Sequence, residues 1–245
     1  MIGWAERLAR RVNPADAERI SKALMASIDQ VSGTRWEAAV ARAATLPGDI
    51  RPEKMKSLTD AFARELAGFG ATAGAVAATP LIGTTATMLA ATAELAWFTS
   101  RAGDLILTVA ALHGMPEPTI DERRAWVLAV LIYGSTAREG FARAVNEANT
   151  GLSPATNTRL PVATLQQVNK VMGRALVRHY GTRRGAIALG TALPLGIGAL
   201  VGGGANFMAV RSLARHAEQF FARLPYSAID TTAVDITGIL EQPEQ

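Results

Sequence analysis

The sequence predicts an all-α protein, folded as a single multi-helix bundle. Signals for helix starts and stops recur along the chain, and no segment has the alternating pattern of a strand ladder. Two long uncharged stretches, residues 66–93 and 185–210, are rich in Gly, Ala and Thr. Each is interrupted near its middle by proline followed by glycine, at Pro80 and at Pro194, which is typical of a helical hairpin.

The first 60 residues predict two helices and the start of a third. Asn13 can cap a helix, Pro14 fits its first turn, and the helix is expected to reach about Val31 and to stop near Gly33. A second helix is expected over residues 34–44. A turn at residues 46–49 separates it from a third helix, which begins near residue 51 and leads into the first uncharged stretch.

Helices are also expected through the rest of the chain. One runs from Pro80 to about His113, and residues 114–118 end it. Thr119 and Glu122 have capping-box spacing and open a helix to about Asn149. After a polar loop, helices are expected over residues 161–181 and, beyond Pro194, to about residue 223. We divide the chain into N-terminal helices (1–60), a helical domain (61–224) and a loosely docked tail (225–245).

The length of the uncharged stretches favours hairpins over simple membrane spans. Residues 66–79 would form a helix of about 21 Å at about 1.5 Å per residue, short of the roughly 30 Å of a bilayer core. The hairpins can therefore be buried core or can make shallow contact with a membrane. Basic residues flank the second stretch: Arg183, Arg184, Arg211 and Arg215. They suit contact with anionic headgroups and suit equally the solvated ends of a buried hairpin.

Composition narrows the function classes. The net charge is +4, but no basic run alternates with aromatic residues, so nucleic-acid binding is not expected. The chain has no Cys and its three His residues lack metal-ligand spacing, so no metal site and no cofactor are expected. Nucleotide-binding and hydrolase motifs are missing too, which makes an enzyme the least favoured hypothesis. Without a signal peptide at the N-terminus, a cytoplasmic location is expected.

Four residues are candidates for a polar site beside the hairpins. Glu94 ends the first uncharged stretch, and Arg101 lies seven residues further along the same helix face, with Trp97 between them. Asn206 occupies the corresponding place after Pro194. Together they could bind a polar head group. The alternative is structural: an ion pair for Glu94, an interhelical hydrogen bond for Asn206 and a core position for Trp97.

An ordered set of residues repeats in both halves of the chain. The first half has Gly68, Gly70, Gly74, Pro80, Gly83, Glu94, Arg101 and His113-Gly114. The second has residues 193–203, with Leu-Pro-Leu-Gly at its start, then Asn206, Ala214, Ala217, Phe220 and Phe221. This set resembles the EcsC protein family over residues 61–224, although the first half has Thr where glycine is expected and His113 stands at an aromatic position. The resemblance implies a cytoplasmic or membrane-peripheral accessory role and supplies no catalytic residues.

The sequence thus favours a non-enzymatic, EcsC-like helical protein at the inner face of a membrane, bound to the membrane surface or to a membrane protein complex. The alternative is a soluble carrier or sensor that binds a lipid-like ligand between its glycine-rich hairpins.

Overall fold

The computed structural model describes residues 14–77, 84–148, 160–181, 204–222 and 224. All regular structure in these ranges is helical, which confirms the predicted fold class. The helices are α2 (Pro14–Thr34), α3 (Trp36–Thr45), α4 (Arg51–Ala77), α5 (Thr84–Leu112), α6 (Ile120–Tyr133), the short 3-10 helix η1 (Gly134–Thr136), α7 (Ala137–Ala148), α8 (Val162–Gly181) and α11 (Gly204–Ala222). The predicted breaks at Pro80 and Pro194 and the predicted tail lie outside the described residues.

Local signals place most helix ends close to where the sequence predicts them. At the start of α6, the Thr119 side chain accepts a hydrogen bond from the Glu122 backbone and the Glu122 side chain accepts one from the Thr119 backbone. This is the predicted capping box. The predicted helix from Thr119 to Asn149 is, however, two helices. It breaks at Gly134, whose φ of 55° and ψ of −119° are incompatible with an α-helix.

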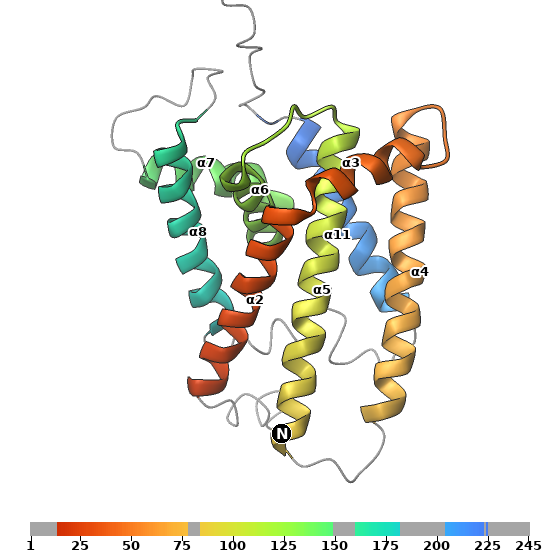
Figure 1. Cartoon of the computed structure of the whole chain (residues 1–245), viewed down its shortest axis with the longest axis vertical. Helices are drawn as coiled ribbons and strands as arrows, with labels where there is room; N and C mark the ends of the chain where they lie inside the picture. Colours follow the sequence, from red (N-terminus) through yellow and green to blue (C-terminus); the bar gives the residue numbers. More distant parts are fainter. Residues whose placement is uncertain (1–13, 78–83, 149–159, 182–203, 223, 225–245) are drawn as a thin grey trace, which may run out of the picture.

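Helix α5 is the centre of the bundle. It contacts α2, α3, α4, α6 and α11, and Figure 1 shows it between α2 on one side and α4 on the other. Its nine consecutive residues 102–110 are all buried. A helix that is apolar on one face only cannot bury every side of a turn, so this segment is enclosed by neighbours all around.

Aromatic side chains join α3, α6, α7 and α11. Trp126 of α6 makes edge-to-face contacts with Trp36 of α3 and Phe221 of α11, at centroid distances of 6.4 Å and 5.3 Å. Phe220 meets Phe141 of α7 at 5.9 Å. These contacts are of the geometry that aromatic quadrupoles favour. They belong to a core to which helices on both sides of residue 60 contribute.

The helix ends that lie in or beside the two uncharged stretches are in the same half of the molecule. Helices α4 and α8 end in the lower half of Figure 1, and α5 and α11 begin there. Helices α4 and α5 run in opposite directions and contact each other, and α11 contacts both. Among the described helices, none combines the length and the apolar character needed to cross a bilayer.

Candidate functional site

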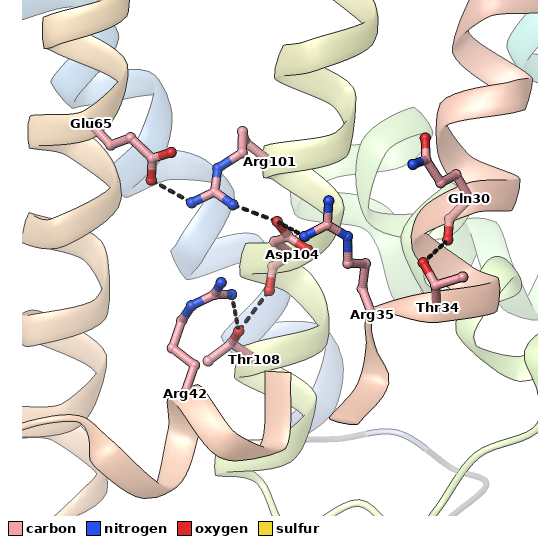
Figure 2. Close-up of polar contacts among 8 residues, drawn as sticks. All are labelled: Gln30, Thr34, Arg35, Arg42, Glu65, Arg101, Asp104 and Thr108. Atoms are coloured by element: carbon pink, nitrogen blue, oxygen red, sulfur yellow. Dashed lines mark hydrogen bonds and ion pairs between the residues drawn. The ribbon is translucent and has the colours of Figure 1, made fainter. Parts of the chain in front are cut away.

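A cluster of charged side chains surrounds Arg101, one of the predicted site residues, where α3, α4 and α5 meet (Figure 2). Arg101 Nη1 donates to Asp104 Oδ2 at 2.6 Å, and its Nη2 donates to the Glu65 carboxylate. Asp104 lies one turn further along α5 and its side chain is only 2% exposed. Glu65 comes from α4, so the guanidinium joins two helices through two charge-assisted hydrogen bonds.

A second cation lies near the buried carboxylate. Arg35 stands between α2 and α3, and its Nη1 is 4.0 Å from Asp104 Oδ2. An isolated carboxylate in the interior would cost several kcal/mol, and usually ionises only when it is paired and hydrogen-bonded. Asp104 therefore holds the segment before α3 against α5 as well as orienting Arg101.

Arg42 of α3 completes the cluster. Its Nη1 donates to Thr108 Oγ1 at 3.3 Å, while the Thr108 hydroxyl donates to the Asp104 backbone carbonyl at 2.7 Å. The guanidinium carbons of Arg42 and Arg101 lie 5.4 Å and 4.9 Å from the centre of the Phe62 ring. Stacking of this kind favours arginine over lysine, because the planar guanidinium covers the ring face.

This cluster holds helices together, and we call it the Arg101 clamp; its members are Arg35, Arg42, Glu65, Arg101, Asp104 and Thr108. Both Nη atoms of Arg101 are engaged, and only its buried Nε has no hydrogen-bond partner. No group of His, Asp and Glu side chains in the described part of the chain could hold a metal ion. The candidate role of Arg101 as a ligand-binding residue would require a bound group to compete with Glu65 or Asp104.

The structure describes the other predicted site residues unevenly. Trp97 is half-buried and packs against the core. Glu94 lies in α5 and Asn206 in α11, but their side chains are outside the described part, so the site that they were predicted to form with Arg101 stays a prediction.

Among the predicted basic contact residues, Arg211 and Arg215 are exposed on α11, and Arg211 Nη2 is 3.9 Å from Asp60 Oδ1 of α4. Arg183 and Arg184 lie outside the described residues.

Sequence reasoning missed Asp104, Glu65 and Arg42. A signal for Asp104 was present, because it follows Arg101 at the i,i+3 spacing of helical ion pairs and precedes the uncharged residues 105–112. Glu65 directly precedes the first uncharged stretch, and no other feature of the sequence marks it as a site residue. Nothing in the sequence indicated that Glu65 and Arg101, 36 residues apart, would meet.

One serine–histidine pair bears on the hydrolase hypothesis. Ser212 Oγ lies 3.4 Å from His216 Nε2 on α11, and both line a cavity of about 350 Å³ beside Tyr133. Burial, with a smaller effect of Arg215, lowers the pKa of His216, which favours a neutral imidazole. A hydrolase would also need a group that orients the imidazole. The described residues that line this cavity include no carboxylate.

No protein-family model matches this chain, and no curated protein and no solved structure is significantly similar to it.

Proposed function

We propose that this chain is a non-enzymatic, EcsC-like helical protein that binds the periphery of a membrane, or a complex in it, through one end of its bundle. The observation that carries the proposal is the common location of four helix ends. The first uncharged stretch includes the last turns of α4 and the first turns of α5. The second begins four residues after α8 and includes the first turns of α11. These four helix ends all lie in the lower half of Figure 1.

The distribution of charge supports this orientation. Between Glu65 and Glu94 the chain has no charged residue. Glu65 and Arg101, which bind each other in the Arg101 clamp, lie outside this stretch, before and after it in the sequence. Beside the second stretch, Arg211 and Arg215 of α11 are exposed. Basic residues near an anionic surface contribute about 1 kcal/mol each, so they favour the inner, anionic face of a membrane.

Vesicle flotation tests the proposal. The full chain, purified without detergent, is mixed with vesicles of phosphatidylcholine containing 30% phosphatidylglycerol and with vesicles of phosphatidylcholine alone. We expect flotation with the anionic vesicles that resists high salt and is abolished by detergent, since apolar insertion dominates. Flotation that high salt abolishes, or none with either lipid, would contradict insertion of the uncharged stretches.

Matched substitutions sharpen the test. Ile82→Asp and Leu200→Asp each introduce a carboxylate into one uncharged stretch, and Ile50→Asp introduces one at an exposed isoleucine just before α4, at the opposite end of that helix. A charge at the bilayer centre costs about 2.5–3.5 kcal/mol on the insertion scale, so a shallow site predicts at least about tenfold weaker binding. Ile50→Asp should bind like the unchanged chain. Equal loss in all three variants would overturn the assignment of this end.

The alternative, a carrier of a lipid-like ligand, has a separate readout. Native mass spectrometry of the detergent-free protein would then show a bound lipid, and the protein would remain in solution when vesicles float.

A further inference from the structure

Helices α2, α6 and α8 line an open cavity of about 730 Å³ away from the Arg101 clamp. Its volume is within the range of about 300–1,000 Å³ that small-molecule sites occupy. It is lined by Met25, Asp121, Arg124, Gln166, Asn169, Lys170, Gly173 and Arg174. Neither the predicted site residues nor the proposed membrane contact accounts for it.

Asn169 is the central polar group of this cavity and is only 4% exposed. Its Nδ2 donates to the Asp121 backbone carbonyl at 2.9 Å and to Asp121 Oδ1 at 3.2 Å. These two acceptors fix the orientation of the amide, because the opposite orientation would place oxygen against oxygen. Its Oδ1 accepts no hydrogen bond from the described residues. A buried acceptor without a donor costs about 1–3 kcal/mol, so a bound donor would stabilise this site.

Positive charge dominates the rest of the lining. Arg124, Lys170 and Arg174 are cations, and Asp121 is the single carboxylate. Arg124 Nη2 is held by Asp29 Oδ1 at 3.1 Å, which leaves its buried Nε without a partner among the described residues. Lys170 and Arg174 are exposed, and no described carboxylate forms an ion pair with either of them.

We infer that this cavity binds a phosphate monoester that also carries a hydroxyl group. A phosphate monoester has a charge of about −1.5 to −2 near pH 7 and three strong acceptor oxygens, which matches a lining with three cations and one carboxylate. The hydroxyl group of the ligand donates to Asn169 Oδ1. Met25 and Gly173 provide the apolar surface for the carbon skeleton. A soluble metabolite and a lipid headgroup share this chemistry.

A titration of the full chain followed by ¹H–¹⁵N NMR tests the inference, with glycerol 3-phosphate as the soluble probe and glycerol as the control without phosphate. We expect saturable shifts of the Asn169 side-chain amide with glycerol 3-phosphate and none with glycerol. Phosphatidylcholine vesicles that contain lysophosphatidic acid, which has a phosphate monoester and one free hydroxyl group, provide the lipid source of the same chemistry.

Arg174→Glu is the informative variant, because Arg174 is exposed and its replacement should leave the fold intact. A charge-assisted hydrogen bond contributes about 1.5–3 kcal/mol, so the affinity should fall by about 10- to 100-fold. Arg138→Glu on α7 makes the same charge change at an exposed position outside the cavity and should have little effect.

Binding of either probe supports the site, and the comparison of the two probes shows whether the ligand is a soluble molecule or a lipid. Saturable binding of glycerol 3-phosphate that Arg174→Glu weakens supports a soluble ligand. Binding to lysophosphatidic acid vesicles beyond that to phosphatidylglycerol vesicles, with the same dependence on Arg174 and no binding of glycerol 3-phosphate, supports a lipid ligand. The inference is overturned if neither probe binds, or if Arg138→Glu weakens binding as much as Arg174→Glu does. Because binding to phosphatidylglycerol vesicles is only the baseline of the lipid arm, this site and the membrane proposal stand or fall separately.

Discussion

Arg101 and Asp104 lie one turn apart on α5, with Arg101 Nη1 2.6 Å from Asp104 Oδ2, and they form the best-buried ion pair in the described part of the chain. Asp104 is 2% exposed and Arg101 18% exposed, whereas the Glu18–Lys22 pair of α2 is 67% and 76% exposed. Both are ion pairs between a carboxylate and a basic side chain, but one is buried and the other exposed. This difference in burial determines how much each pair contributes to the free energy of unfolding.

Asp104→Asn should lower the free energy of unfolding by about 3–5 kcal/mol, the usual effect of removing one partner from a buried pair. Arg101 and Arg35 would then lose a buried carboxylate that both approach. Chemical denaturation followed by circular dichroism measures the change. The control is Glu18→Gln, which breaks an exposed pair and should leave the free energy of unfolding almost unchanged. Similar small effects in both variants would show that the clamp does not stabilise the fold.

The approach of α2 to α5 depends on a missing side chain at Gly103. A Cβ at this position would lie 2.7 Å from Val31 Cγ1, closer than real carbon contacts allow. Gly103→Ala should therefore lower the free energy of unfolding by about 1–3 kcal/mol through overpacking, and shortening Val31 to Ala in the same chain should recover part of the loss. A thermal unfolding series of the single and double variants measures this coupling.

Gly33 in α2 provides the matched control, because a Cβ there would meet nothing within 4 Å. Gly33→Ala should be neutral or stabilise the protein by up to about 1 kcal/mol, as alanine favours helix over glycine. If Gly103→Ala behaved like Gly33→Ala, the close approach of α2 and α5 would not be tight.

The sequence was most informative where one short signal determines one helix end. Thr119 and Glu122 predicted the start of α6, and the prolines and glycines around residues 46–49 and 114–118 predicted where α3 and α5 end. Such signals act through backbone groups a few residues away, so no tertiary information is required.

The clamp and the cavity could not be predicted in the same way. Glu65 and Arg101 come from different helices, and Asn169 meets Asp121 across 48 residues. Helix packing determines these pairs, and one sequence does not specify which faces pack together. Sequence reasoning consequently chose Arg101 but could not identify its partners.

The presence of a glycine also does not predict whether a helix continues or ends at that residue. Gly103 and Gly140 lie inside helices, whereas Gly134 ends one, and nothing in the residues beside them separates the cases. Gly134→Ala should lower the free energy of unfolding by about 1–3 kcal/mol, since a φ of 55° with a ψ of −119° is strained for any residue with a Cβ. Denaturant midpoints measure the change. Gly173→Ala in α8 is the control, because its Cβ would make an ordinary 3.5 Å contact with Met25 Cε.

His113, just after α5, gives the fold a dependence on pH. Burial, with a smaller effect of Arg51, lowers its pKa from 6.5 to about 4. Its ring lies beside Phe221 at a centroid distance of 6.3 Å, and its buried Nε2 has no partner among the described residues. The end of a helix favours a cation by about 0.3–1 kcal/mol, but the loss of hydration outweighs this effect.

The sign follows from proton binding in the two states. The unfolded chain binds a proton at His113 with a pKa near 6.5 and the folded chain only near 4, so acidification favours unfolding. The contribution of His113 to stability is complete above pH 6.5 and is lost as the pH falls towards 4. His113→Gln should therefore flatten the decline in unfolding free energy between pH 6.5 and 4.5.

The lowered pKa of His216 acts in the same direction, so the comparison is best made in a His216→Gln background, where His113 is the remaining described histidine whose pKa is lowered. Denaturation curves at several pH values provide the slopes. If His113→Gln left the slope unchanged, the decline would arise from other groups, and Asp60, whose pKa is lowered mainly by the hydrogen bond from Lys56, would be the first to test.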